Sequence, residues 1–135
     1  MDVCLFCKIA AHEIPSTTLY EDEHTIAFLD IHPVKPGHTL VVPKAHAADV
    51  CDSRVQDLAR VIEVVQKITP AILKTVGATG FNFSANTGAA AGQVIFHTHF
   101  HLIPRHDDDG LLPWKHEGAS PEALAALGNQ IRTCL

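Results

Sequence analysis

The side chains of this sequence best suited to chemistry stand in one short run, in which His97, His99 and His101 alternate with Thr98 and Phe100. Successive side chains of a β-strand point to opposite faces, so we expect the three imidazoles on one face, with neighbours roughly 6.5–7 Å apart. Buried polar rings are costly unless each has a partner, so this row indicates catalysis or metal binding rather than an incidental polar face. The opposite face is expected to pack against the core and carries Phe96, Thr98, Phe100 and Leu102.

A segment of small residues, Asn86–Gln93 with the sequence NTGAAAGQ, precedes the histidine strand. Its glycines and alanines would let backbone N–H groups come close to an anion, although a flexible connecting loop has the same composition. An imidazole nucleophile beside an anion cradle is suited to phosphoryl or nucleotidyl transfer.

The two cysteines Cys4 and Cys7 form a C-x-x-C pair near the N-terminus. On one helical turn or knuckle, residues three apart lie on the same side. Such a pair is typical of a metal site or of a redox pair, and in a reducing compartment both are favoured over a structural disulfide. Zinc commonly takes two cysteines with two histidines as ligands. The residue types alone are therefore compatible with a metal site but do not decide between it and a redox pair.

The composition excludes several classes of protein. With a formal net charge of −5 over 135 residues, the chain has no excess of basic side chains for a phosphate footprint, so we expect no nucleic-acid partner. Nothing resembles a signal peptide or a membrane span, and we expect a cytoplasmic protein without membrane contact. The length predicts a single domain over residues 1–135.

The predicted elements alternate between strands and helices. A short helix is expected within Cys4–Ala11, a long one from a capping box at Ser53 and Gln56 to Gly77 with a kink at Pro70, and a C-terminal amphipathic one after Ser120. Strands are predicted at Thr18–Tyr20, Thr25–Leu29, Thr39–Val42, Phe81–Ser84 and Ile95–Ile103. This order predicts an α+β fold with a mostly antiparallel sheet.

The H-x-H-x-H run with two apolar residues after it resembles the histidine triad (HIT) superfamily of nucleotide hydrolases and transferases. The likeness extends along most of the chain and in the order of that family. It includes LFCKI (Leu5–Ile9), EIP (Glu13–Pro15), AFLDIHP (Ala27–Pro33), PGHTLVVPKAH (Pro36–His46), the GQ before the triad, and HLIPR (His101–Arg105). The later PRHDDDGLLPW resembles the bacterial members.

The resemblance implies a catalytic role for two histidines. His99 would be the nucleophile that attacks the α-phosphorus of a nucleotide, giving a nucleotidyl-histidine that water hydrolyses. Its other ring nitrogen would be held by a backbone carbonyl of the Gly-rich segment. His101 would donate to the phosphate oxygens as charge develops, with a merely structural histidine as the alternative.

The resemblance also implies a set of nucleotide-binding residues. Asp30 would bind the ribose hydroxyls, although a carboxylate in a turn before Pro33 has the same appearance. Core packing is likewise an alternative for the residues that would line the base pocket. Those residues are Phe6, Ile9 and Phe28, and the polar residues near the phosphates are Asn86 and Gln93.

A structural zinc ion is a further implication, held by Cys4, Cys7, His46 and His97 as in some members of the superfamily.

Val94 stands where many members have Ser or Thr, so the leaving-group preference is open. The resemblance implies a homodimeric hydrolase of purine nucleotide phosphoramidates or dinucleoside polyphosphates. The alternatives are a nucleotidyl transferase to an acceptor other than water and a zinc-stabilised nucleotide-binding or scaffold protein. No role is assigned to His12, His24, His32, His38, His106 and His116.

Overall fold

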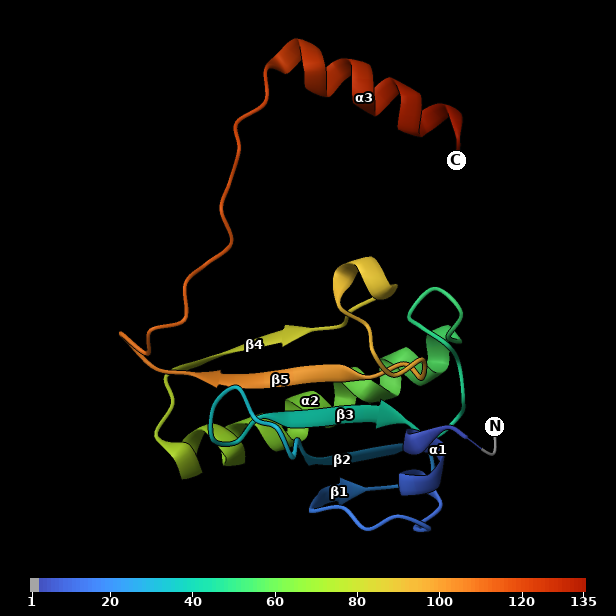
Figure 1. Ribbon diagram of the computed structural model, residues 1–135, viewed down its shortest axis with the longest axis vertical. Helices are drawn as coiled ribbons and strands as arrows, with labels where there is room; N and C mark the ends of the chain where they lie inside the picture. The colour runs from blue at the N-terminus through green and yellow to red at the C-terminus, as the bar shows by residue number, and fades with distance from the viewer. Residues whose placement is uncertain (1–2) are drawn as a thin grey trace.

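A five-stranded antiparallel sheet organises the computed structural model, which describes residues 3–135. The strand order is β1-β2-β3-β5-β4, so β1 and β4 form the two edges (Figure 1). The α+β fold with a long helix and a C-terminal helix is therefore confirmed. The strands are β1 (Thr18–Glu21), β2 (Thr25–Leu29), β3 (Thr39–Pro43), β4 (Gly80–Ser84) and β5 (Phe100–Arg105).

Helix α2 (Val55–Val76) covers one face of the sheet. Its apolar stripe packs on side chains that alternate along β2, β3 and β5, because every second residue of a strand faces the same side. The core on this face consists of Ala27, Val41, Val61, Val64, Val65, Ile68, Ile72 and Leu102. Phe100 packs against this cluster as well, as expected for Phe100 and Leu102.

The start of α2 differs from the prediction, whereas its end agrees. Arg54 is the N-terminal cap and makes no side-chain capping bond. The hydroxyl of Ser53 instead bonds to Asp49 O and to Thr98 Oγ1, at 2.8 and 2.7 Å, which ties it to the histidine segment. The helix continues through Pro70 and ends at Gly77, whose φ of 69° is left-handed.

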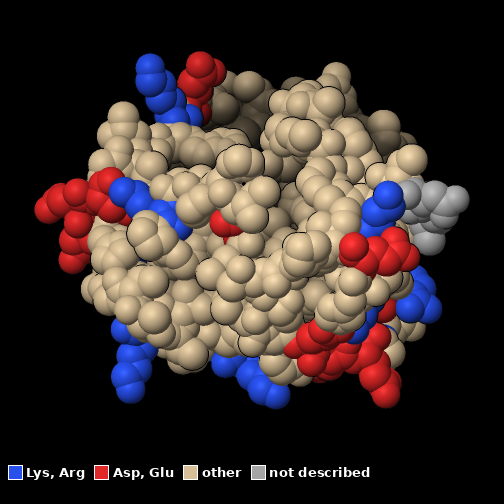
Figure 2. Space-filling model, turned by 60° about the horizontal axis from the view of Figure 1, so that its bottom comes forward, with Lys and Arg blue, Asp and Glu red and all other residues tan. Residues whose placement is uncertain are grey.

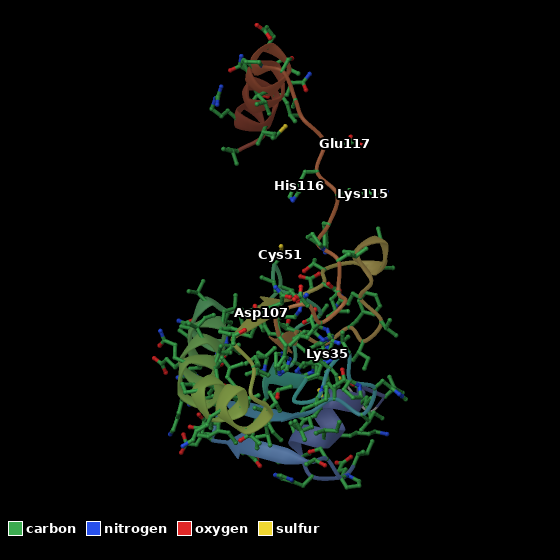
Figure 3. All side chains as sticks on the ribbon, turned by 90° about the vertical axis from the view of Figure 1, so that its left-hand side faces the viewer. Lys35, Cys51, Asp107, Lys115, His116 and Glu117 are labelled. Carbon is green, nitrogen blue, oxygen red and sulfur yellow. The ribbon has the colours of Figure 1, made fainter. Side chains whose placement is uncertain are left out.

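The opposite face of the sheet carries α1 (Leu5–Ala10). Its two buried residues, Phe6 and Ile9, join a second core of side chains from β2 and β3. Figure 3 shows the sheet in profile between α1 and α2. The second core comprises Phe6, Ile9, Ile26, Phe28, Leu40 and Val42.

The last strand is shorter than predicted. β5 begins at Phe100, so the predicted strand Ile95–Ile103 is wrong over its first half. Hydrogen bonding explains the difference, because the N–H of Thr98 donates to Ala47 O at 2.8 Å rather than to a neighbouring strand. Phe96 is 51% exposed and not in the core. His97 and His99 therefore lie in an irregular segment, and only His101 belongs to the strand.

Helix α3 (Pro121–Thr133) begins at the predicted cap, where Ser120 Oγ accepts from the N–H of Ala123 at 3.1 Å. It follows an extended segment and stands clear of the sheet, as Figure 1 shows. No residue of α3 is buried. Its apolar side chains Leu124, Leu127 and Ile131 are 57, 54 and 53% exposed. None of the helices in residues 3–135 combines the length and the apolar composition needed to cross a membrane.

Gly37, in the predicted Pro36-Gly37 turn, allows a test of this packing. Its φ is +88°, and an added Cβ would lie 3.1 Å from Pro104 Cγ and from Val76 Cγ1. Gly110 has a φ of +82° with open space around it. Both substitutions to Ala carry the left-handed strain of about 1–2 kcal/mol. Gly37→Ala should reduce the free energy of unfolding by roughly 1–3 kcal/mol more than Gly110→Ala, because only Gly37 is overpacked. Denaturant unfolding measures both, and equal losses would contradict the packing.

Candidate functional site

His99 has one ring nitrogen in a hydrogen bond, and the other has no hydrogen-bond partner within residues 3–135. Its Nδ1–H donates to the carbonyl oxygen of His97 at 2.7 Å, which leaves the lone pair on Nε2. The carbonyl that accepts this hydrogen bond was predicted in the Gly-rich segment, but it belongs to His97. The irregular backbone at His97 and His99 brings the carbonyl of His97 within reach of the His99 ring. A neutral imidazole with a fixed tautomer and a free Nε2 is suited to act as a nucleophile.

The ring of His99 lies between an aromatic residue of α1 and the next histidine. Phe6 approaches edge-on, with 4.9 Å between ring centroids, and the His101 centroid lies at 5.1 Å. Phe6 also meets Phe28 edge-on at 5.7 Å. Phe6, Ile9 and Phe28 are thus residues of one buried core, of which Phe6 contacts His99, and a role in binding a base stays a prediction for them.

Cys4, Cys7, His46 and His97 form one group, the Cys₂His₂ cluster, at the junction of α1, the loop after β3 and the histidine segment. The Nδ1 atom of His97 lies 3.3 Å from Cys4 Sγ, 3.5 Å from Cys7 Sγ and 3.2 Å from His46 Nδ1. Cys7 Sγ lies 3.3 Å from His46 Nδ1. The four residues that the resemblance implied as zinc ligands are therefore brought together.

These distances fit a tetrahedral metal site. With metal–nitrogen bonds of about 2.0–2.1 Å and metal–sulfur bonds of about 2.3 Å, tetrahedral edges are about 3.3–3.4 Å between nitrogens and about 3.6 Å between nitrogen and sulfur. The Nε2–H of His97 donates to Pro43 O at 2.7 Å, which directs the Nδ1 lone pair into the cluster. Burial lowers the pKa of His97, so its ring is neutral, as a ligand must be.

The thiol of Cys7 makes metal binding by the cluster dependent on pH. Burial and the neighbouring Cys4 raise its pKa to about 11 in the absence of a metal. Because the thiolate is the ligand, metal binding at neutral pH must release a proton from this side chain.

His101 contacts a histidine to which the sequence analysis gave no role. Its Nδ1 lies 2.9 Å from Nε2 of His38, and the two ring centroids are 5.2 Å apart. His38 precedes β3, and β3 pairs with β5 so that Leu40 opposes His101. Only this pairing brings His38 and His101 together, and strand register was the missing signal in the sequence.

Asp30 has both a turn role and an available oxygen. Its Oδ1 accepts from the N–H of His32 at 2.8 Å, as in the predicted turn. Its Oδ2 lies 3.6 Å from His38 Nε2, beyond a normal hydrogen bond. Asp30 therefore stands next to the His38–His101 pair, and binding of ribose by its free oxygen stays a prediction.

Gln93 is a buried side chain that joins three segments. Its Oε1 accepts from the N–H of Gly88 at 2.8 Å, and its Nε2 donates to Ala48 O at 2.7 Å and Ile95 O at 3.2 Å. The amide thus supports the small-residue loop from within. Asn86 is half-buried near Gly92, where an added Cβ would lie 3.5 Å from Asn86 Nδ2. Contact of Asn86 and Gln93 with phosphate stays a prediction.

Charged side chains are unevenly distributed over the surface that Figure 2 shows. On the face that Figure 2 shows, charged side chains stand around the periphery, and uncharged surface fills most of the centre. No continuous basic patch is seen on this face among the described residues. An anionic ligand here would depend on ring and backbone N–H groups rather than on lysine or arginine.

The protonation of His101 can be measured. Burial, together with His99 and His38, lowers the pKa of His101 from 6.5 to about 4. Because the folded value lies below the unfolded one, the unfolded state binds more protons between these values. The contribution of His101 to stability is therefore complete above pH 6.5 and is lost as the pH falls toward 4. NMR titration of the His101 ring should give a pKa below 5, and a value of 6 or more would contradict the burial.

Comparison with known proteins identifies relatives of this chain. The HIT domain profile matches residues 11–108. The chain is 39% identical over 130 residues to the adenosine 5′-monophosphoramidase hnt1 of Schizosaccharomyces pombe, covering 95% of each chain. It is 42% identical over 121 residues to the adenylylsulfatase HINT3 of Arabidopsis thaliana, covering 90% of this chain and 60% of that protein.

Solved structures give the same result. A Streptococcus mutans protein superposes with a TM-score of 0.92 at 38% identity, over 98% of this chain and 85% of that one. A Zn-bound histidine triad family protein of Mycobacterium smegmatis superposes with a TM-score of 0.78 at 35% identity, over 99% of each chain. With the triad geometry, the profile match and these relatives in agreement, the chain belongs to the HIT family.

Proposed function

We propose that this protein hydrolyses purine nucleotides substituted at the α-phosphate, either phosphoramidates or dinucleoside polyphosphates, through a nucleotidyl-His99 intermediate. The observation that carries the proposal is the free Nε2 of His99, whose tautomer is fixed by the His97 carbonyl. The names of two relatives, a monophosphoramidase and an adenylylsulfatase, support cleavage next to an adenylyl phosphorus.

In the first step the Nε2 lone pair of His99 attacks the α-phosphorus. The bond to the substituent breaks with its electron pair, and the departing group takes a proton from solvent. The ring of His99 then carries a positive charge, which the His97 carbonyl stabilises through Nδ1–H. In the second step water attacks phosphorus and releases a proton to solvent, and the nitrogen–phosphorus electron pair returns to His99 as the nucleotide leaves.

The other predicted residues surround this reaction. His101 follows His99 on the same side, and its ring N–H would stabilise charge on the phosphoryl oxygens. Asp30 has one carboxylate oxygen available for a ribose hydroxyl, and the buried ring of Phe6, which packs on Phe28, lies beside His99. The backbone N–H groups of the loop supported by Gln93 are candidates for the phosphate.

The nucleophile is tested by replacing His99. His99→Ala should lower turnover of adenosine and guanosine phosphoramidates by at least roughly 10³-fold while nucleotide still binds, because only the attacking atom is removed. His116→Ala, on the extended segment before α3 (Figure 3), is the control and should leave turnover unchanged. Acid quench should trap a nucleotide on His99. Absence of turnover by the unaltered protein on both phosphoramidates and dinucleoside polyphosphates would refute the hydrolase and favour a binding protein.

We also propose that the Cys₂His₂ cluster holds one structural zinc ion. The donor set, the edge lengths and the His97–Pro43 hydrogen bond support a closed four-coordinate site. The Zn-bound relative supports the choice of metal. The chemistry that zinc would supply is cross-linking: it would join α1 to the loop after β3 and to the segment that carries His99.

Elemental analysis tests the zinc site. Protein purified without chelators should contain about one equivalent of zinc per chain, because structural sites are near-stoichiometric. Cys7→Ser should lose the metal and lower the thermal unfolding temperature. Cys51→Ser, at an exposed cysteine outside the cluster, should keep both. Less than about a tenth of an equivalent in the unaltered protein, together with a Cys4–Cys7 disulfide, would refute the site.

We further propose a homodimer in which α3 packs on the second copy. An apolar hollow of about 520 Å³ lies between β1 and the second half of α2, with Leu19, Ile68 and Ile72 in its lining. This hollow is at the β1 edge, whereas α3 lies beyond the β4 edge (Figure 1). A second copy next to β4 would offer its own hollow to the apolar stripe of α3.

The dimer is tested by sedimentation equilibrium. The full chain should sediment as a dimer at micromolar concentration. Leu127→Asp should raise the dimer dissociation constant at least tenfold, because a carboxylate would be buried without a partner. Gln130→Asp on the same helix is the matched control for added charge and should have a smaller effect. A monomeric full chain, or equal effects of the two variants, would contradict the arrangement.

A further inference from the structure

His38 is a buried histidine that the two reaction steps do not use. Its side chain is 3% exposed and lies at the end of a tight loop before β3. The loop is closed by the N–H of Asp30, which donates to His38 O at 2.9 Å, and by the N–H of His38, which donates to Lys35 O at 3.0 Å. This folding brings the backbone N–H of Val34 to 3.1 Å from His38 Nδ1.

The contact with Val34 fixes the proton of His38. A backbone N–H can only donate, so Nδ1 of His38 must accept with its lone pair. A neutral imidazole has one ring proton, and that proton is therefore on Nε2. Burial lowers the pKa of His38, against a smaller opposing effect of Asp30, which agrees with the neutral ring.

The proton on His38 Nε2 has one acceptor within reach. Asp30 Oδ2 is 3.6 Å away, beyond a normal hydrogen bond, whereas His101 Nδ1 is 2.9 Å away. His101 therefore accepts at Nδ1 and, being neutral, keeps its own proton on Nε2. His101 Nε2 makes no hydrogen bond within residues 3–135 and is not a buried unpaired atom, so it is open to a ligand.

The same argument excludes a metal at this group. Asp30, His38 and His101 have ligand atoms close enough together to hold an ion. His38 could use Nε2 as a ligand only if its proton moved to Nδ1, where it would face the N–H of Val34. Two donors facing each other in a buried position are strongly unfavourable. The group is therefore a hydrogen-bonded chain and not a metal site.

We propose that His38 is a positioning residue that keeps the proton of His101 on Nε2, ready to donate to a phosphoryl oxygen. The chain runs from the N–H of Val34 through His38 to His101. This inference rests on the proposed function for the ligand it serves. In the other tautomer His101 would present a lone pair to an anionic phosphate and would repel it.

Two substitutions of His38 separate the proposed donor from general packing. In His38→Asn the short amide can still accept from Val34 but cannot reach His101. In His38→Gln the longer amide carries an N–H near the original Nε2 position. Thermal unfolding and zinc content of both variants are measured first, so that a folding defect is recognised.

The first readout is the ¹⁵N chemical shifts of the His101 ring, which report the tautomer without any reaction. The unaltered protein and His38→Gln should show the Nε2–H form, and His38→Asn should show a mixture or the Nδ1–H form. An Nδ1–H form in the unaltered protein, or an unchanged Nε2–H form in His38→Asn, would overturn the proposal.

The second readout is turnover. The value of kcat should fall roughly 10²–10³-fold in His38→Asn, the range for loss of one donor to developing charge, with a smaller change in KM. His38→Gln should recover most of the loss. Equal activity of the two variants would overturn the role of His38. A lack of turnover in the unaltered protein would refute the proposed hydrolase, whereas the ring shifts decide the tautomer by themselves.

Discussion

His97 joins the two groups of side chains on which the site depends. Its imidazole turns Nδ1 toward the Cys₂His₂ cluster, and its carbonyl oxygen accepts the Nδ1–H of His99 at 2.7 Å. A rotation of the His97 backbone would disturb both groups together. Helix α1 and its N-terminal cap supply the cysteines, and strand β3 ends at Pro43, whose carbonyl accepts a hydrogen bond from His97. Both elements therefore constrain the orientation of His99 through His97.

The triad also shows how hydrogen bonds orient three imidazole rings without a strong surrounding charge. The three imidazoles, buried at His97 and His99 and partly buried at His101, each meet a group with a fixed hydrogen-bonding role: the Pro43 carbonyl at His97, the His97 carbonyl at His99, and the ring of His38 at His101. Burial lowers the pKa of His97 and of His101, and the hydrogen-bonding partners select one tautomer for each of the three rings. A net charge of −5 is compatible with anion binding because the donors are local.

Local sequence patterns predicted most elements, and the family resemblance supplied the Cys₂His₂ grouping and a backbone carbonyl at His99, although that carbonyl belongs to His97 and not to the Gly-rich segment. The local patterns failed where distant segments compete for the same backbone. The alternation around Thr98 predicts a strand, but its N–H bonds to Ala47, and Ser53 bonds to Thr98 instead of capping α2. His38 could not be assigned because its partner depends on the register of β3 and β5, which one sequence does not contain.

The arm formed by the extended segment and α3 is structurally separate from both cores of the chain. The HIT domain profile ends at residue 108, and no residue of α3 is buried in either core of the chain. Changes in α3 therefore leave the packing around α1, α2 and the sheet as it is. The arm is a part of the molecule where length and sequence can diverge, or a label can be attached, while the domain that carries the triad still folds.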